Sequence, residues 1–436
     1  MEQGMVFKCV AFMLGLGTTV SLWPAVTNAQ EVGDLKRELE THKQRTAELE
    51  KRIGQLESRQ EKTDASAAQQ KGQEKKDGAI PDILKWAAKV NLYGDLRYRY
   101  EYIDDNSAAT DRHRNRVRAR LGLDAKVNDE WDLGFRIATG NGEVSGDPVS
   151  TNQTLDEAFS RKPIWLDLAF LGYHPQWCEG LDIYLGKINL PFYRVGKNEL
   201  VWDSDLTPEG GAILYGMPLN DKTTLNMVAG GFWVNEESTG GDTSLWALQA
   251  YLKHQISKPT YILGGASLFC YGNIQGEEGL ADEWDDDGDA FFGNTQAPGD
   301  VFASDYDLLE LFAEFGTQVR GMPVTVFGDW VHNSVAVDEA EDTGWLVGGI
   351  LNRAKDPRSW QFEYDYRDIE LDAVVGQFTN SDFIGGGTGG QGHRFAFSYV
   401  VAKNVVAALT YFDNQFKGRN DDEEYDRLQA DVIVKF

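Results

Sequence analysis

Arginines occur at alternate positions in segments 92–102 and 115–127 of the chain, and one more lies in the neighbouring segment 131–140. The guanidinium charge is permanent, so such residues either pair with carboxylates or attract anions. If the segments are β-strands, a two-residue spacing places the arginines of each strand on one face of the sheet. We therefore predict one basic patch, formed by Arg97, Arg99, Arg116, Arg118, Arg120 and Arg136.

A second charged set lies in segment 191–209, which combines six apolar residues with four acids and is unusual for a solvent loop. We expect its apolar side to lie on a protein wall and its carboxylates to lie in water. Facing the basic patch, they would create a transverse electric field. These carboxylates belong to Glu199, Asp203, Asp205 and Glu209.

Both sets have a plainer interpretation. The arginines can pair with nearby carboxylates and brace the sheet, and segment 191–209 can pack on a rim or at a subunit contact. The two interpretations of the arginines are compatible with each other. The bracing carboxylates would be Asp95, Glu101, Asp124 and Asp132.

The sequence contains few motifs that would indicate an enzyme or a metal site. It has no Gly-x-Ser-x-Gly motif, and its six histidines are scattered without metal-ligand spacing. The acidic loop 274–305 resembles a calcium loop at Glu283–Gly288, but Asn294 stands where a bidentate glutamate is expected. We predict no catalytic residues, no metal and no cofactor, and a solvated acidic loop.

The elements that position these residues are strands. From residue 89 onward, apolar and polar residues alternate, as in 115–127, where Val117 and Leu121 oppose Arg116 and Arg120. This period of two is typical of a β-sheet with unlike faces. The pattern predicts sixteen strands: 89–103, 115–127, 131–140, 164–174, 181–190, 210–219, 223–235, 244–256, 259–273, 306–319, 323–335, 343–354, 359–374, 392–402, 405–416 and 425–436.

The connections between these strands favour a membrane barrel over a soluble sandwich, which also alternates. Short turns such as 257–258 and 403–404 alternate with long loops such as 141–163 and 274–305. An even number of strands with short turns at one rim and long loops at the other is the signature of outer-membrane barrels. Aromatic residues near strand ends or on outward faces add a membrane-interface girdle: Tyr98, Tyr100, Tyr102, Trp131, Trp165, Trp246, Trp345, Trp360 and Tyr411.

Composition excludes several other classes. The 436 residues carry 42 basic and 69 acidic side chains, a net charge of −27, which argues against a nucleic-acid partner. Beyond the N-terminus no run of 18 apolar residues predicts a membrane helix. Three cysteines are too few for a disulfide scaffold.

The N-terminal part differs from the rest. Residues 1–29 have the basic start, apolar run and small residues of a signal peptide. Residues 30–60 carry a heptad seam, which predicts a coiled coil, and 61–88 is a polar linker before a barrel at 89–436. A single solvated helix is the alternative for 30–60. The seam consists of Val32, Leu35, Leu39, Leu49, Ile53 and Leu56.

As a whole the chain resembles Gram-negative porins, and most closely those families with a periplasmic coiled coil before a 16-stranded barrel. The segments NLYGDLRYRYEY, NRVRARLGLDAKV and the terminal ADVIVKF carry the likeness, together with the heptads. The resemblance implies an all-β transmembrane antiparallel barrel preceded by an α-helical coiled coil. It also implies a homotrimer of water-filled channels for passive diffusion of ions and small hydrophilic solutes, with the third outer loop, here 191–209, folded inward to face the arginine patch.

The same resemblance places the barrel in the outer membrane, in contact with its lipid and lipopolysaccharide, and the coiled coil in the periplasm, with peptidoglycan as a further partner. Four other functions stay open. The barrel can anchor a tether between outer membrane and cell wall, or serve one specific solute. It can also be an outer-membrane hydrolase, or a sleeve for a cytochrome, although the chain has no haem motif.

Overall fold

The computed structural model describes residues 89–106, 108–142, 145–238, 241–280, 290–417 and 423–436. All of them belong to the second of two compact units, Leu84–Phe436. The predicted signal peptide, coiled coil and linker lie outside the described residues, and so does the segment that resembles a calcium loop, Glu283–Gly288.

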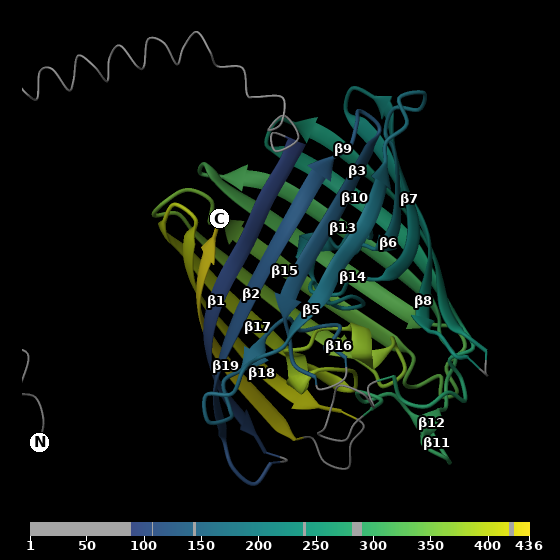
Figure 1. Ribbon diagram of the computed structural model, residues 1–436, viewed down its shortest axis with the longest axis vertical. Coiled ribbons are helices and arrows are strands. Elements are labelled where there is room, and N and C mark those ends of the chain that lie inside the picture. Colours follow the sequence, from purple (N-terminus) through teal and green to yellow (C-terminus); the bar gives the residue numbers. More distant parts are fainter. Residues whose placement is uncertain (1–88, 107, 143–144, 239–240, 281–289, 418–422) are drawn as a thin grey trace, which may run out of the picture. The chain divides into compact units, whose positions relative to one another are not determined.

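Sixteen long antiparallel strands form one closed barrel, each paired with its neighbours along the chain (Figure 1). All sixteen predicted strands are present, and their ends differ from the prediction by a few residues. They are β1 (Val90–Asp105), β2 (Arg112–Lys126), β3 (Trp131–Thr139), β5 (Ile164–Tyr173), β6 (Leu181–Lys187), β7 (Glu209–Asn220), β8 (Thr223–Asn235), β9 (Thr243–Ser257), β10 (Thr260–Gly272), β13 (Asp307–Val319), β14 (Met322–Asn333), β15 (Thr343–Asn352), β16 (Trp360–Ile369), β17 (Gly390–Ala402), β18 (Val405–Phe416) and β19 (Glu424–Lys435).

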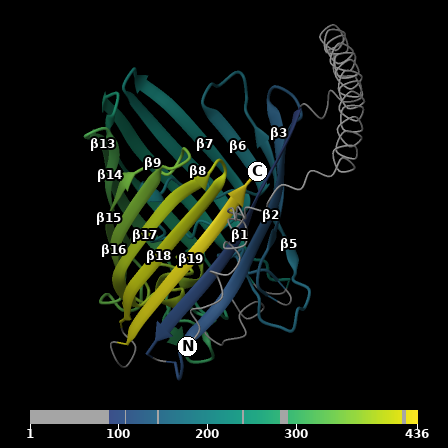
Figure 2. The ribbon, with the colours of Figure 1, turned by 90° about the vertical axis from the view of Figure 1, so that its left-hand side faces the viewer.

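The barrel closes where β1 pairs with β19, in a register that runs from Asp95 opposite Lys435 to Asp105 opposite Tyr425 (Figure 2). Closure leaves no free sheet edge, so the backbone N–H and C=O groups of the strands find partners inside the sheet. This is the condition that a bilayer sets for a spanning structure.

Smaller elements lie in the long loops. Among the described residues there is no α-helix, and no helix is long and apolar enough to cross a membrane. The short elements are β4 (Gln153–Thr154), β11 (Gln296–Ala297), β12 (Val301–Phe302) and the 3-10 helices η3 (Val195–Lys197), η4 (Gly376–Phe378) and η5 (Phe383–Gly385).

The barrel is apolar outside and, along β1, β2 and β19, polar inside. On β19, Val432 is 50 % exposed and Val434 is also exposed, whereas Arg427 is 1 % exposed and Asp431 is buried. The alternation seen in the sequence therefore turns its hydrophobic side outward, the reverse of a soluble sandwich and the arrangement expected in lipid. Six of the nine predicted girdle residues are exposed large side chains: Tyr98, Tyr100, Trp131, Trp246, Trp345 and Tyr411.

Short turns and long loops alternate along the chain as predicted. The turn between β13 and β14 is Arg320–Gly321, with φ of 53° and 83°. Positive φ at both central residues matches the right-handed twist of a two-residue hairpin, and glycine adopts it without strain. At the opposite rim, the connections 188–208 and 370–389 span about twenty residues each and contain η3, η4 and η5.

The end of β16 differs from the sequence prediction, which extended this strand to residue 374. The strand ends at Ile369, and Ala373 and Val374 are buried in the following loop. Their apolar character reflects burial in an inserted loop and not a place on the outer wall.

Candidate functional site

Loop 188–208, between β6 and β7, enters the barrel and binds the inner wall on distant strands. The Gly196 amide donates to Glu314 of β13 at 2.7 Å, and Asn198 donates to Asp329 of β14 at 2.8 Å. The backbone of Tyr193 exchanges two hydrogen bonds with the Gln249 side chain of β9. In the sheet, β9 is two strands away from β7, and β13 and β14 are four and five strands away, so the loop reaches across the interior.

Close packing holds the loop against that wall. Gly196 has φ of 57°, and a Cβ atom there would stand 2.2 Å from the Phe327 ring. The Trp202 ring contacts Phe192, Phe269 and Phe378, with centroids 5.7, 5.0 and 6.4 Å away. Burial of each large apolar side chain stabilises the loop by about 2 kcal/mol. The apolar side of the loop thus lies on the wall.

The loop's carboxylates differ from the expectation that they lie in open water. Asp203 is buried and accepts hydrogen bonds from the amides of Asp205 and Ser381. Asp205 pairs with Arg120 at 3.1 Å and accepts from Thr151 at 3.0 Å. Three of the four predicted acids are therefore bound to groups inside the barrel, because Glu199 also binds Asn380.

The fourth predicted acid, Glu209, stands at the start of β7. It pairs with Lys187 at 2.9 Å and is mainly exposed. This pair lies at the two strand ends from which loop 188–208 departs.

The pKa values of Asp203 and Asp205 are shifted in opposite directions by their surroundings. Burial raises the pKa of Asp203 well above its usual range, and the nearby Glu199 and Asp205 raise it further. Burial also acts on Asp205, but Arg118 and Arg120 outweigh it and lower the pKa of that carboxyl. A proton is therefore held at Asp203 more tightly than at Asp205.

Loop 370–389, between β16 and β17, also enters the barrel and covers loop 188–208. The Asp203 amide donates to the Phe378 carbonyl at 2.7 Å, and the Thr379 hydroxyl donates to the Leu200 carbonyl at 2.8 Å. We predicted no role for this segment from the sequence, although it contains a run of glycines at 385–387. Its insertion depends on partners that come from other strands.

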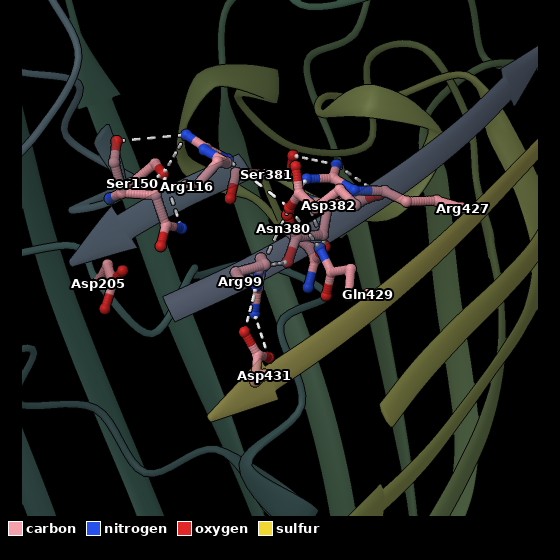
Figure 3. A network of polar contacts seen from close by, with 12 residues as sticks. Arg99, Arg116, Ser150, Asp205, Asn380, Ser381, Asp382, Arg427, Gln429 and Asp431 are labelled. Carbon is pink, nitrogen blue, oxygen red and sulfur yellow. Dashed lines mark hydrogen bonds and ion pairs between the residues drawn. The ribbon is translucent and has the colours of Figure 1, made fainter. Parts of the chain in front are cut away.

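Asp382 ties loop 370–389 to the closing seam of the barrel (Figure 3). Its carboxylate lies 2.7 Å from Arg427 of β19 and 3.1 Å from Arg99 of β1. Burial opposes its ionisation, but Arg427 and Arg99 outweigh that effect and hold the pKa of Asp382 far below its usual range. The loop is thus fixed by a buried charged contact as well as by packing.

The structure places all six predicted arginines on the inner wall of β1, β2 and β3. Most are paired: Arg99 with Asp431 at 2.8 Å, Arg118 and Arg120 with Asp95, and Arg136 with Asp167. The bracing interpretation holds for Asp95 and for Glu101, which contacts Arg99 and Arg427. It is wrong for Asp132, which instead binds His174.

Two arginines are weakly paired. Among the described residues, the carboxylate nearest to each lies 3.9 Å away, that of Asp431 for Arg97 and that of Glu101 for Arg116. Both side chains also bind neutral groups of loop 140–163, at Asn152 and Ser150 (Figure 3 shows the Arg116–Ser150 contact). The Nε atoms of both are buried without a hydrogen-bond partner. Their charge is therefore the least neutralised of the patch.

Further arginines of the inner wall were not among the residues predicted from the sequence. Arg114 and Arg427 both bind Glu101, and Arg367 and Arg394 share Asp365 across β16 and β17. Alternation alone places Arg427 inward beside Gln429 and Asp431 in the last strand. The position of Arg427 on the inner wall could therefore have been predicted from the sequence. No group of three or more metal-binding side chains occurs among the described residues.

Three cavities border these loops. One of about 1120 Å³ is lined by Asp167, Lys187 and Asp205, and one of about 440 Å³ by Tyr93, Phe170 and Tyr184. Both lie along β5, β6 and the ends of loop 188–208. A third, of about 560 Å³, lies between loops 140–163 and 370–389 over the outer half of β2.

Comparison with known proteins identifies the chain's relatives. A family described as "Putative porin" matches residues 102–310 and 302–436. The high-pH structure of OprB from Pseudomonas putida superposes with a TM-score of 0.53 at 11 % identity, over 82 % of this chain and 97 % of that one, and this likeness supports the fold. No curated protein sequence matches.

Two further barrels are similar at lower TM-scores. The outer membrane channel DcaP of Acinetobacter baumannii gives 0.46 at 15 % identity, over 80 % of this chain and 97 % of that one. OmpF of Salmonella typhi, in complex with daunomycin, gives 0.48 at 11 % identity, with the same coverage.

Proposed function

Because the chain belongs to the "Putative porin" family, and is therefore an outer-membrane porin and not an enzyme, we propose that ions and small hydrophilic solutes diffuse through it past a constriction. Loop 188–208 forms one side of this constriction, and the arginine-bearing wall of β1, β2 and β3 forms the other. The observation that carries the proposal is the attachment of the loop to Glu314 and Asp329 on the far wall.

The cavities support a path on one side of the barrel. Loop 188–208 occupies the space next to β9, β13 and β14, where its apolar residues are buried. The cavities of about 1120 and 440 Å³ lie instead beside β3, β5 and β6. A solute entering from the long-loop rim would pass the first and then the second.

Charged pairs stand along this path. The Arg120–Asp205 pair joins β2 to loop 188–208, and the Arg136–Asp167 pair joins β3 to β5. The Lys187–Glu209 pair stands where the loop leaves β6 and returns to β7. Opposite charges at close range order water and favour solutes with separated charge. Selectivity then depends on the arginines whose charge is least neutralised, Arg97 and Arg116.

Replacing residues 192–205 by a short glycine–serine linker tests the constriction. The single-channel conductance of the purified protein in planar bilayers should rise at least about twofold, because conductance follows the narrowest cross-section. An unchanged conductance in a variant that still inserts and opens would contradict the proposal. Deleting Glu339 and Ala340, two exposed residues in the loop between β14 and β15 that line neither cavity of the path, serves as the control.

The assembly of the protein is part of the proposal. The resemblance to porins favours a homotrimer in contact with outer-membrane lipid and lipopolysaccharide, with residues 30–60 as a periplasmic coiled coil that can meet peptidoglycan. The exposed apolar outer face of the strands supports the lipid contact. Native mass spectrometry of the full chain and of a variant lacking 30–80 would show whether trimers form and whether they need the N-terminal segment.

A tether between outer membrane and cell wall remains the alternative. Deleting residues 30–80 separates the two functions. A tether loses envelope attachment, whereas a porin keeps its conductance. A channel for one specific solute is a variant of the porin proposal. Because the inner wall carries arginines, the charge of that solute is the first property to examine.

A further inference from the structure

Three aromatic side chains line the cavity of about 440 Å³, on the inner wall near the short turns, which we call the aromatic cavity. They are Tyr93 of β1, Phe170 of β5 and Tyr184 of β6. The Phe170 and Tyr184 rings meet edge to face, with their centroids 5.7 Å apart. The cavity lies on the path that we propose for solutes, where Ile188 and Pro191 begin the inserted loop.

Each of the three rings stands opposite a glycine of a neighbouring strand. A Cβ atom at Gly122 would lie 2.3 Å from the Tyr93 ring, and one at Gly134 would lie 2.3 Å from the Phe170 ring. The two rings therefore lie against the wall, in space that the side chain of any other residue would fill. The opposed pairs in the register are Tyr93–Gly122, Phe170–Gly134 and Tyr184–Gly172.

Two carboxylates of the aromatic cavity have oxygen atoms without a partner. Among the described residues, Asp124 of β2 makes no hydrogen bond or ion pair. The Oδ1 atom of Asp132 is buried without a hydrogen-bond partner, whereas its Oδ2 atom contacts His174 at 3.1 Å. A buried oxygen without a donor is unfavourable, so a ligand that brings positive charge to it is stabilised.

The bases of this part of the wall do not neutralise the cavity. In the part of the chain that the structure describes, no basic residue lines it. Arg136 is already paired with a carboxylate of β5, and Lys126 stands opposite Asp132 in the register but is exposed and makes no ion pair with it. His174 is shared between Asp132 and Asp182, so even its protonated form leaves one negative charge there.

We propose that the aromatic cavity binds small organic cations that carry a methylated ammonium group. This inference rests on the proposed porin function, because the cavity is reached through the barrel, and it names a class of solute. The face of an aromatic ring attracts a cation, and a methylated ammonium group also buries its methyl groups against the rings. The volume suits such a solute, because ligand pockets of small molecules begin at about 300 Å³.

Charge and hydration decide between this class and other solutes. The carboxylates Asp124 and Asp132 repel anions. A neutral solute gains nothing from their charge. A primary ammonium group is compact and strongly hydrated, so it loses more hydration than a methylated one when it enters a cavity lined by rings. Only a cation with an apolar surface uses both the rings and the carboxylates.

Calorimetric titration of the full-length protein in detergent tests the site with three probes. Choline carries a trimethylammonium group, 3,3-dimethyl-1-butanol has the same shape without the charge, and ethanolamine carries a primary ammonium group. We expect choline to bind about tenfold more tightly than either of the others. Equal binding of choline and the neutral alcohol, or of choline and ethanolamine, would overturn the inference.

A charge variant with a matched control assigns the binding to the cavity. D124N removes a carboxylate that has no partner among the described residues, so the fold should persist, and choline binding should weaken about fivefold. D356N removes the same charge from an exposed short turn outside the cavity and should leave the affinity within about twofold of wild type.

A second pair of variants tests the rings. F170L keeps an apolar side chain but removes one ring from the cavity, and it should weaken choline binding about fivefold. F135L makes the same change on the outer face of β3, where Phe135 is exposed, and should leave choline binding unchanged. Equal loss in a variant and its control would overturn the site.

The results separate this inference from the proposed function. A protein that conducts ions normally but binds choline no better than the neutral alcohol would overturn the cation site alone. A protein that binds choline as described but shows no conductance in bilayers would instead overturn the porin proposal.

Discussion

Arg427 of β19 and Glu101 of β1 lie 2.8 Å apart across the seam where the first and last strands of the barrel meet. The side chains are 1 % and 0 % exposed, so the pair is almost completely removed from water. Arg114 and Gln429 also bind Glu101, and Asp382 binds Arg427. Barrel closure and the position of loop 370–389 are thus joined in one polar network.

Replacing Glu101 with Ala should strongly destabilise the barrel. The substitution leaves Arg427 and Arg114 buried without their shared carboxylate, and breaking a buried pair in this way typically costs about 3–5 kcal/mol. Unfolding of the purified protein in detergent by guanidinium measures the change. The control is E424A, which removes an exposed acid of the neighbouring strand β19 and should have an effect below about 0.5 kcal/mol. Equal midpoints for the two variants would contradict the network.

Replacing Gly196 with Ala should loosen loop 188–208. An alanine Cβ meets the Phe327 ring at 2.2 Å, and φ of 57° adds about 1 kcal/mol of backbone strain. Hydrogen exchange of the loop and single-channel conductance should both increase.

Gly299 provides the matched control, because its φ is also positive, at 104°, but a Cβ there meets nothing within 4 Å. G299A should therefore show the backbone effect without a change in conductance. If both variants conduct alike and differ from wild type, the contact with Phe327 does not set the position of the loop.

Replacing Asp382 with Asn should release loop 370–389 from the seam. Arg99 keeps Asp431, but Arg427 loses one of its two carboxylates, and the loop loses its charged anchor. We expect faster hydrogen exchange at residues 376–386 and a stability loss of about 2–4 kcal/mol. The D356N variant, in a turn at the other rim, should leave exchange in this loop unchanged, and similar protection in both variants would exclude the anchor.

His174, which lies in the turn after β5, should make a pH-dependent contribution to the free energy of unfolding. It contacts Asp132 at 3.1 Å and Asp182 at 2.5 Å. Burial lowers its pKa, but the hydrogen bonds to Asp182 and Asp132 outweigh it, so the pKa in the folded protein is raised. The contribution is therefore complete below about pH 6.5, the unfolded value, and is lost as the pH rises through the folded value.

Melting temperatures of wild type and H174Q, measured below and above about pH 6.5, report the contribution of His174. Wild type should lose stability relative to H174Q as the pH increases above about 6.5. H254Q, at another histidine near the same rim, serves as the comparison and should follow wild type. Parallel curves for wild type and H174Q would refute the role of this contact.

The strand pattern could be predicted because it depends on local alternation. In β2, each second residue from Arg112 to Arg120 is Arg, and each second residue from Val117 to Ala125 is apolar, so the period, the two faces and the approximate ends follow from the sequence. Whether the apolar face meets lipid was decided by the lengths of the connections. The exposure of Val432 beside the burial of Arg427 bears this out.

The pairing of charges could not be predicted in the same way. Asp431 reaches Arg99 because the barrel closes β1 against β19, and Asp382 reaches both Arg99 and Arg427 because a loop folds back inside. These contacts join residues far apart in the sequence. For the same reason, Asp203 and Asp205 of segment 191–209 were expected in water, whereas loop 370–389 and Arg120 surround them.

The reversal potential of single channels in a salt gradient tests the central claim most directly. The claim is that water and ions pass through the barrel along the arginine-bearing wall. Arg97 and Arg116 are the least neutralised charges there, so R97Q/R116Q should shift the reversal potential toward cation selectivity relative to wild type, whereas R320Q/R358Q should not. Identical reversal potentials in all three proteins, or the absence of ion conductance from the correctly folded wild type, would contradict the account.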